Sequence, residues 1–210
     1  MSAGFDAPGL LARRTLLLTE PALHAFAPET PRHGDHQMNP ELSGAAARPA
    51  AVLVPLVAHT NGLTVLLTRR AAAMRDHSGQ IAFPGGKIDA ADGTALAAAL
   101  REAEEEIGLN QRFIEPLGYL DPYQTGTGFR IQPVVALVTP PLHLTLHPGE
   151  VEEAFEVPLA FLMDPANHQR HARVWAGRER FFYAMPYHDY YIWGATAGIL
   201  HNLYERLYSG

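Results

Sequence analysis

The clearest hydrophobic pattern begins at residue 50, where short apolar runs predict strands. Ala50–Ala58 and Leu63–Thr68 are two such runs, and His59-Thr60-Asn61-Gly62 lies between them. Since Asn-Gly favours a tight turn, this segment predicts a β-hairpin. Further strands are predicted at Ile81–Phe83, at Phe113–Leu120, at Phe129–Val138, around Val151, Phe155 and Val157, at Arg180–Met185 and at Tyr190–Trp193. A bulge is expected at Pro133, because proline cannot donate to a ladder.

Helical spacing of apolar residues is present in two longer segments. The first helix is expected to begin after Asp92 or Thr94, which can cap it, and to end at the permissive Gly108. Its predicted apolar stripe consists of Leu96, Leu100, Ala103 and Ile107. The second amphipathic helix is predicted at Ala195–Leu207. Shorter helices are predicted at Leu10–Leu18, Pro21–Phe26 and Leu159–Met163.

The first helix carries an unusual set of acids near its C-terminal end. Glu102, Glu105 and Glu106 are predicted to share a face away from the apolar stripe. Arg101 lies beside them, whereas Glu104 points elsewhere. A helix C-terminus disfavours negative charge, and like charges at i,i+4 repel by roughly 0.2–0.5 kcal/mol. The pattern fits either a solvated acidic face or carboxylates that hold a cation.

The residues before this helix favour the cation. Gly85-Gly86 permits a tight turn and close approach of the backbone to a ligand. Three carboxylates and a backbone carbonyl are hard oxygen ligands that suit Mg²⁺ or Mn²⁺. Such an ion orients a diphosphate, offsets its charge and activates a water.

The whole-chain composition narrows the classes of function. With 210 residues, 47% of them hydrophobic and 18% charged, the chain is expected to fold as one domain with a substantial core. A net charge of −6 argues against a nucleic-acid partner. The absence of cysteine excludes disulfides, zinc thiolates and a cysteine nucleophile. No apolar run approaches the roughly 18 residues of a membrane span and no signal peptide is visible, so we expect no membrane partner and a cytoplasmic location.

From Gly86 to Leu109 the chain resembles the Nudix hydrolases. The box of that family is a Gly, five residues, a Glu, seven residues, then Arg-Glu, an apolar residue, any residue, Glu-Glu, any residue, Gly and an apolar residue. Gly86 takes the first place, and Arg101–Leu109 matches the whole second half. The first acidic place holds Asp92, which is followed by eight residues rather than seven, so the resemblance leaves the role of Asp92 open.

Residues upstream of the box resemble the coenzyme A pyrophosphatase branch of the same family. The matching pattern consists of Leu66-Leu67-Thr68-Arg69-Arg70-Ala71, Arg75, Gly79 and Phe83-Pro84-Gly85-Gly86. The branch also commonly has the residues found here at His77, Ser78, Gln80 and Ile81, and a segment like Ile192–Leu200. Arg70 and Arg75 occupy fixed places of the pattern, and guanidinium groups bind phosphate oxygens bidentately. Arg69 does not occupy a fixed place.

The resemblance implies an α/β fold of the Nudix type, an α/β/α sandwich in which a mixed β-sheet has helices on both faces. Residues 1–49 are expected to form an N-terminal helical or loop extension, and residues 50–210 the Nudix hydrolase domain. The implied reaction is hydrolysis of the pyrophosphate bond of coenzyme A, acyl-CoA or oxidised CoA, dependent on Mg²⁺ and/or Mn²⁺. Its products would be adenosine 3′,5′-bisphosphate and 4′-phosphopantetheine.

The resemblance also assigns site residues. The expected metal ligands are Gly86, Glu102, Glu105 and Glu106. The expected catalytic residues are Glu102, Glu105, Arg101 and Glu150, with either Glu102 or Glu150 taking the proton of the attacking water. The expected substrate contacts are Arg70, Arg75, His77, Gly79 and Gln80.

Several alternatives stay open. The substrate is a coenzyme A derivative or another nucleoside diphosphate derivative such as ADP-ribose, NADH or a nucleoside triphosphate. A non-catalytic nucleotide-binding module is the third reading, and both a monomer and a homodimer fit. Tyr123 or Phe129 either stacks on an adenine or anchors the core. His33 and His36, in the loop-like run that includes Gly34–Pro40, are expected to be exposed rather than metal ligands.

Overall fold

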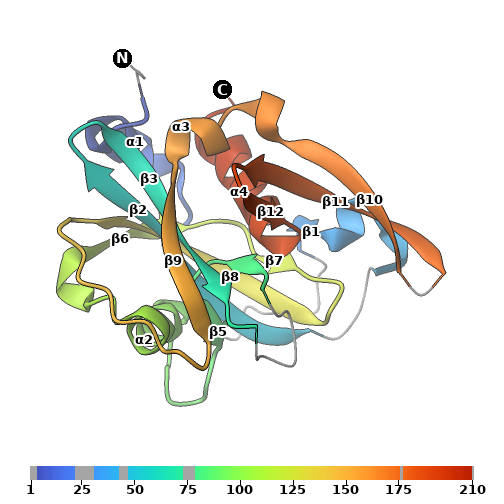
Figure 1. Cartoon of the computed structure of the whole chain (residues 1–210), viewed down its shortest axis with the longest axis horizontal. Coiled ribbons are helices and arrows are strands. Elements are labelled where there is room, and N and C mark those ends of the chain that lie inside the picture. Colours follow the sequence, from blue (N-terminus) through green and yellow to red (C-terminus); the bar gives the residue numbers. More distant parts are fainter. Residues whose placement is uncertain (1–3, 22–30, 43–46, 73–78, 176, 210) are drawn as a thin grey trace.

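The computed structural model describes residues 4–21, 31–42, 47–72, 79–175 and 177–209 (Figure 1). The α-helices are α1 (Ala7–Arg13), α2 (Ala95–Ile107), α3 (Leu159–Leu162) and α4 (Ala195–Leu207). The strands are β1 (His33–Gly34), β2 (Arg48–His59), β3 (Gly62–Arg70), β4 (Ile81–Ala82), β5 (Gly85–Lys87), β6 (Ile114–Tyr119), β7 (Tyr123–Gln124), β8 (Phe129–Val138), β9 (Val151–Pro158), β10 (Gln169–Trp175), β11 (Arg178–Tyr187) and β12 (Tyr190–Trp193). Short 3₁₀ helices are η1 (Arg14–Leu16), η3 (Asp35–Gln37), η4 (Pro40–Leu42), η5 (Gln111–Phe113) and η6 (Pro165–Asn167).

Nine strands form one mixed sheet in the part of the chain that is described. Its central path is β1-β7-β8-β2-β3-β4, while β5 pairs with β2, β6 with β8 and β9 with β3. The strands β2 and β8 run parallel, with Arg48–Val57 opposite Phe129–Val138. The strands β2 and β3 run antiparallel around the Asn-Gly turn, so the predicted hairpin is confirmed.

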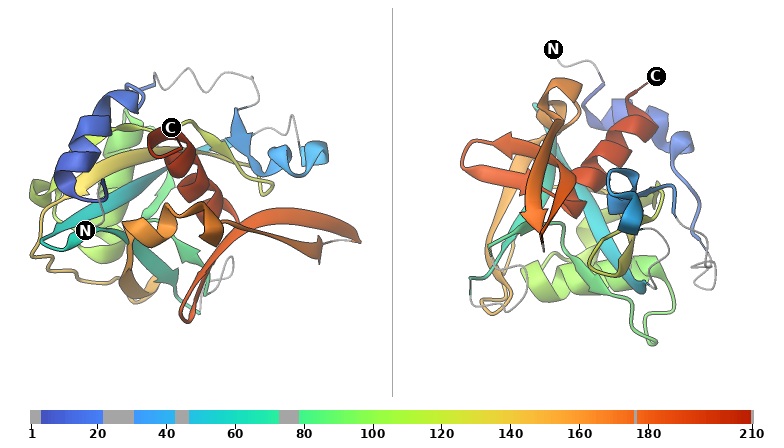
Figure 2. Two further views of the ribbon diagram at one scale, coloured as in Figure 1. Left: turned by 90° about the horizontal axis from the view of Figure 1, so that it is seen from above. Right: turned by 90° about the vertical axis from the view of Figure 1, so that its right-hand side faces the viewer.

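Side chains alternate along the strands, so this sheet has an apolar surface on each face, and helices cover both. In β2, Leu53 and Val57 belong to a buried cluster that includes residues of α2. Val54 and Leu56 point the other way, into a cluster that includes residues of α4. Figure 2 shows α2 and α4 on opposite sides of the sheet. The predicted α/β/α arrangement with a mixed sheet is therefore confirmed.

The helix α2 has the predicted ends but buries a different face. The Oγ1 atom of Thr94 accepts a hydrogen bond from the N–H of Ala97 at 3.0 Å, and Gly108 ends the helix in a left-handed conformation with φ 65°. Leu96 and Leu100 of the predicted stripe are only partly buried. The fully buried positions are Ala95, Ala98, Ala99, Ala103, Glu106 and Ile107. Small alanine side chains let the helix lie close to the sheet, which turns the larger leucines to its flank.

A second sheet consists of β10, β11 and β12 in that order, all antiparallel. It extends from the body as an arm (Figure 2, left). One face packs on α4 through buried Met185 and Ile192. The strand β10 is absent from the sequence predictions, and β11 runs on to Tyr187, which makes the predicted Pro186–Asp189 connection too long. The last helix, α4, has the predicted bounds, and among the described residues no helix is long and apolar enough to cross a bilayer.

The N-terminal segment departs from the sequence prediction. The helix α1 begins before Leu10 because Asp6 caps it, with its side chain accepting a 2.8 Å hydrogen bond from the N–H of Gly9. After Arg13 the helix is followed by a 3₁₀ turn. Most of the predicted helix Pro21–Phe26 lies outside the described residues.

The predicted loop after residue 32 is also different. His33 was predicted to be exposed, but it is buried, with 5% of its surface accessible, because β1 pairs with β7 at the edge of the sheet. Tyr123 of β7 is buried, and its hydroxyl donates to Asp35 at 2.7 Å, so this ring anchors the core. The predicted bulge at Pro133 is wrong. The register shift lies in the partner strand β6, between Pro116 and Gly118.

Candidate active site

The acids of α2 lie beside β5, where two glycines bring the backbone close to them. The N–H of Gly85 donates to Oε2 of Glu106 at 3.1 Å. A Cβ added to Gly86 would lie only 2.5 Å from Oε1 of Glu102, so any other residue there would displace that carboxylate. The two predicted glycines therefore set the backbone directly against two acids of the helix.

Glu106 is the buried acid of this group, with 4% of its surface exposed. This corrects its predicted place on the outward face, because it follows Ala103 by one turn on the alanine side of α2. Burial raises the pKa of Glu106 to about 7, while the N–H of Gly85 and the charge of Arg70 oppose the shift. Two neighbouring carboxylates add to the rise in this pKa.

Those two neighbours are Glu102 and Glu150. Burial raises the pKa of Glu102 above its ordinary value, and the charges of Glu105 and Glu150 add to the rise. Hydrogen bonding to Arg101 works against it. Glu102, Glu106 and Glu150 thus lie within one electrostatic field that has a surplus of negative charge.

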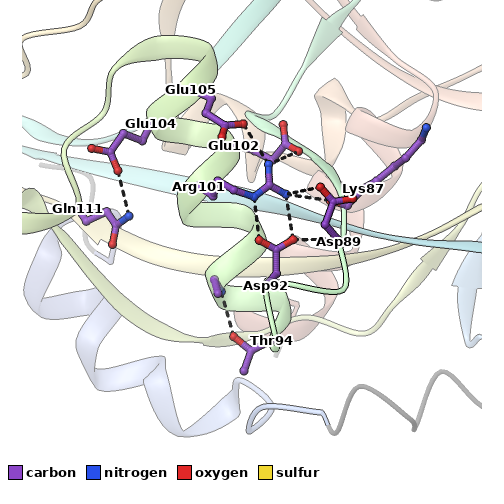
Figure 3. A network of polar contacts seen from close by, with 10 residues as sticks. Lys87, Asp89, Asp92, Thr94, Arg101, Glu102, Glu104, Glu105 and Gln111 are labelled. Carbon is purple, nitrogen blue, oxygen red and sulfur yellow. Dashed lines mark hydrogen bonds and ion pairs between the residues drawn. The ribbon is translucent and has the colours of Figure 1, made fainter.

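Arg101 organises the outer part of the site (Figure 3). Its Nε and Nη2 atoms donate to the two oxygens of Asp92 at 2.8 and 2.9 Å. Its Nη1 atom donates to Glu102 at 2.9 Å and to Glu105 at 3.0 Å. The pair with Asp92 is the main reason that the pKa of Arg101 is raised, and it lowers the pKa of Asp92. Asp92, whose role the sequence left open, therefore holds the guanidinium that orients the two glutamates.

The remaining acids differ in exposure. The side chain of Glu105 is 61% exposed, and that of Glu150 is 45% exposed. The backbone of Glu150 is fixed because its carbonyl accepts from the N–H of Ala71 at 2.9 Å. Glu104 turns away, and its carboxylate accepts from Gln111 at 3.1 Å (Figure 3). Glu104 thus provides a natural control for the other acids.

Arg70 faces this site from the end of β3. Its Nη1 atom lies 3.9 Å from Oε1 of Glu106. Its Nε atom is buried and has no hydrogen-bond partner. A buried guanidinium donor without a partner is costly unless a ligand supplies an acceptor.

Two of the other predicted substrate contacts lie on a neighbouring surface, and two lie outside the described residues. Gly79 and Gln80 line an open pocket of about 540 Å³ together with Arg69, which is not among the predicted substrate contacts. Their backbones are tied to β3, since the N–H of Gly79 donates to the carbonyl of Arg70 and the carbonyl of Gln80 accepts from its N–H. Arg75 and His77 fall in residues 73–78, outside the described part of the chain.

The donors of the site suit a divalent cation in kind. Within the described ranges, no three His, Asp or Glu side chains are arranged ready to hold an ion, and in this cluster Arg101 binds both Glu102 and Glu105. The surplus of carboxylate oxygens is nevertheless the donor set that Mg²⁺ and Mn²⁺ prefer. Burial is the main cause of the raised pKa values of Glu102 and Glu106, and the neighbouring carboxylate charges that add to the rise are what a cation would compensate.

Sequence reasoning missed part of the surface around the pocket. Arg173, Tyr191 and Trp193 of the arm line it as well. A signal was present, since His171, Arg173 and Trp175 alternate with smaller or apolar residues, as in a strand with one functional face. The short and mostly exposed strand gave no apolar run to reveal it.

A family model and the sequences of individual proteins both match this chain. A family model for the NUDIX domain matches residues 47–177. The uncharacterized Nudix hydrolase NudL of Enterobacter sp. (strain 638) is 41% identical over 157 residues, which cover 74% of this chain and 81% of that protein. The protein of the same name from Escherichia coli (strain K12 / DH10B) is 40% identical over 157 residues, with the same 74% and 81% coverage.

Solved structures with a similar fold are more distant. The NUDIX domain of Shewanella oneidensis NrtR, solved with ADP ribose, has a TM-score of 0.48 and 20% identity, and the match covers 77% of this chain and 89% of that one. A C. elegans Ap4A hydrolase has a TM-score of 0.45 and 20% identity, with coverage of 52% and 80%.

Proposed function

The chain belongs to the Nudix family and is a Nudix hydrolase, and from this premise we propose that it hydrolyses the pyrophosphate bond of coenzyme A or one of its acyl or oxidised derivatives. The products are adenosine 3′,5′-bisphosphate and 4′-phosphopantetheine. The observation that carries the proposal is the placement of Glu102 against Gly86 and of Glu106 against Gly85, with the charge of Glu150 close enough to add to the rise in both pKa values. The choice of coenzyme A rests on the resemblance of residues 66–86 to that branch of the family.

Glu102, Glu105 and Glu106 would hold Mg²⁺ or Mn²⁺, with the carbonyl of Gly86 as a further ligand. A divalent cation at this place polarises the phosphoryl oxygens and lowers the pKa of bound water. The chain itself contributes orientation. Arg101 holds Glu102 and Glu105 at fixed angles, because Asp92 clamps the other side of its guanidinium.

Arg70 and Glu150 have the remaining roles. The free Nε donor of Arg70 is suited to a phosphate oxygen, which is the acceptor that a guanidinium binds best. Glu150 takes the proton of the attacking water. No described arginine or lysine pairs with Glu150, and its 3.7 Å partner is His147, whereas Glu102 is already bonded to Arg101. Glu150 is therefore the carboxylate left free to reach a water, whereas Glu102 is engaged by Arg101 and is a proposed metal ligand.

The substrate assignment is tested by turnover of a panel of diphosphates with Mg²⁺ or Mn²⁺, with products identified by mass spectrometry. Coenzyme A should be cleaved at least about tenfold more efficiently, in kcat/KM, than dephospho-coenzyme A or ADP-ribose, because charge-assisted bonds to the 3′-phosphate are lost in the latter two. Equal values for the three substrates would contradict the assignment while leaving a Nudix pyrophosphatase of another specificity.

The assignment of Glu150 is tested separately with Glu150→Gln. Loss of a general base lowers kcat about 10²–10⁴-fold and removes the acidic limb of the pH profile of kcat. Glu104→Gln, which changes an acid that is turned away from the site and bonded to Gln111, is the control and should leave kcat within about twofold. An unchanged acidic limb in Glu150→Gln would move the role of base to Glu102. Tight binding of coenzyme A without any cleavage would favour the non-catalytic module.

A further inference from the structure

The outer face of the arm carries an open groove that the proposed reaction does not use. A pocket of about 460 Å³ is lined by His171, Ala172, Arg173, Phe182, Tyr191 and Trp193. It adjoins the 540 Å³ pocket at Gly79 and Gln80, because Arg173, Tyr191 and Trp193 line both. Each volume lies within the roughly 300–1,000 Å³ that is usual for small-molecule sites.

The register of the arm explains why these side chains meet. His171 lies opposite Phe182, Ala184 opposite Trp193, and cross-strand partners share a face. The face that packs on α4 is formed by the alternate residues, so the aromatic face is turned to solvent. The rings are preorganised, since Phe182 and Trp193 meet edge to face at 5.1 Å and the ring of His171 is hydrogen-bonded to Tyr191 at 2.6 Å.

The charged residues of the groove select among ligands. Arg173 is exposed, and no described residue forms an ion pair or hydrogen bond with its guanidinium. Arg69, in contrast, is engaged, because it lies 3.4 Å from Glu153 and stacks over Tyr190 at 5.2 Å. The wider pocket also contains the carboxylates of Glu152 and Asp189.

Aromatic rings, one free guanidinium and two acceptors suit a nucleoside phosphate. A base stacks on rings such as Tyr191 and Trp193. A phosphate pairs with the guanidinium of Arg173, and carboxylates such as Asp189 accept from ribose hydroxyls. An aliphatic chain would fill the volume but would desolvate the charged groups without giving them partners.

We propose that this groove binds the nucleoside-phosphate end of the substrate, with the base on Tyr191 and Trp193 and a phosphate on Arg173. The identity of the ligand rests on the proposed function. The groove ends at Gly79 and Gln80, whose backbones are bonded to Arg70, the arginine that reaches Glu106. A nucleoside diphosphate derivative held in the groove by its nucleoside end therefore extends past β3 toward the carboxylates.

Two tryptophans make a matched binding test possible, because the chain contains no others. Trp193 lines both pockets, whereas Trp175 is 64% exposed near the tip of the arm and lines neither. In a Trp175→Phe protein with chelator and no divalent cation, fluorescence reports on Trp193 alone. Adenosine 5′-monophosphate should quench it saturably, adenosine about fivefold more weakly, and ribose 5-phosphate not at all.

Arginine variants test the phosphate contact in the same assay. Arg173→Gln should make adenosine 5′-monophosphate bind no better than adenosine, because the charge-assisted contact is lost. Arg178→Gln is the matched control, since Arg178 is exposed on the same strand pair and lines neither pocket. Equal binding of the nucleotide by both variants and the parent would overturn the phosphate contact.

Hydrolysis provides the second readout. Trp193→Leu should raise KM for the cleaved diphosphate about 5- to 50-fold with little change in kcat, as expected for the loss of one stacking platform. Trp175→Leu should leave both constants unchanged. Tyr191→Ser, at a residue that is 43% exposed, repeats the test without the risk that the core fails to fold.

The outcomes separate the two proposals. Nucleotide quenching that depends on Arg173 in a protein that cleaves no diphosphate would uphold the groove and contradict the proposed function. Normal cleavage with unchanged KM in Trp193→Leu and Tyr191→Ser, and no quenching, would contradict the groove alone. A change of oligomeric state in Trp193→Leu without any nucleotide binding would also overturn it, because the face would then be a contact between two copies of the chain.

Discussion

The helices α2 and α4 are both 13 residues long and lie on opposite faces of one sheet, yet their charged clusters differ in balance. At α4, Arg206 donates to Asp121 at 3.0 Å, and His33 lies between Asp121 at 3.9 Å and Glu205 at 3.6 Å. Each acid there has a basic neighbour. At α2 the acids outnumber the bases that reach them.

The difference shows what distinguishes a structural cluster from a reactive one. At α4 the guanidinium of Arg206 offsets Asp121, the buried histidines lie beside the acids as neutral partners, and these contacts join β1 and α4 to the loop before β7. At α2, Glu102 and Glu106 have raised pKa values because burial and like charge remain uncompensated. Burial of polar groups is common to both regions, so the surplus of one sign is the more informative feature.

Glu105→Gln makes the largest test of this contrast. We expect kcat to fall about 10²–10³-fold or more, since loss of a single charge-stabilising group has effects of this size. The free energy of unfolding should hardly change, because the side chain is 61% exposed. Steady-state kinetics and urea denaturation measure the two effects. Glu104→Gln, one residue away but turned to Gln111, should change neither, and equal losses in both variants would refute a specific role for Glu105.

Asp121→Asn should give the opposite result at α4. It leaves Arg206 and His33 without their carboxylate in a partly buried place, which costs about 2–3 kcal/mol of stability. The kcat of the folded protein should stay within about twofold. Glu115→Gln, which breaks an exposed pair with Arg14, should cost under about 0.5 kcal/mol. A large loss of kcat in folded Asp121→Asn would erase the proposed division between the clusters.

Arg101→Lys tests how the acidic side chains at α2 are held in place. Lysine cannot contact Asp92 bidentately while also donating to Glu102 and Glu105, so kcat should fall about 10- to 100-fold. Asp92→Asn should reproduce most of this loss, because Asp92 acts through the guanidinium. Restoration of kcat by raised metal concentration in both variants would indicate weakened metal binding. Full activity of Asp92→Asn would show that Arg101 needs no such partner.

The pH dependence of stability gives the smallest and most discriminating test. Burial lowers the pKa of His33 and His201 below the ordinary 6.5. The unfolded chain then binds protons to these histidines at higher pH than the folded one, so their contribution to the free energy of unfolding falls as pH drops below about 6.5 and stops falling below the folded pKa.

The two clusters contribute slopes of opposite sign. The pKa of Glu106 is raised from 4.5 to about 7, so in metal-free protein its contribution to stability increases as pH falls through that interval. His33→Gln should weaken the acid-side loss of stability, and Glu106→Gln should steepen it. Denaturant titrations between pH 5 and 7.5 measure both slopes, and parallel curves for the two variants would be the contrary result.

Much of the fold was predictable because its signals are local. The Asn-Gly hairpin, the caps Thr94 and Gly108, and the bounds of α4 follow from turn chemistry and helical spacing. The mixed sheet with helices on both faces was predicted from the family resemblance, since periodicity alone shows only which elements are present.

The errors have physical causes that no local pattern contains. Glu106 is buried because alanines let α2 lie close to the sheet, and a glutamate in a periodic pattern is normally assigned to the outside. His33 is buried by strands far along the chain. The candidate acids and glycines of the site could be selected from spacing, but the clamp on Arg101 by Asp92 and the groove at Trp193 depend on side chains that only tertiary structure brings together.

The longest ladder of the sheet, between residues 48–57 and 129–138, also has a kinetic consequence. Its two halves are separated by the hairpin, α2 and β6, so a nascent chain that ends before Phe129 has no partner for one side of β2. Parallel pairing over such a sequence distance closes slowly, since the loop entropy is lost before the contacts form. During synthesis α2 therefore cannot complete its packing against the sheet until β8 has been made. A chaperone that shields the unpaired edge of β2 should raise the yield of active enzyme.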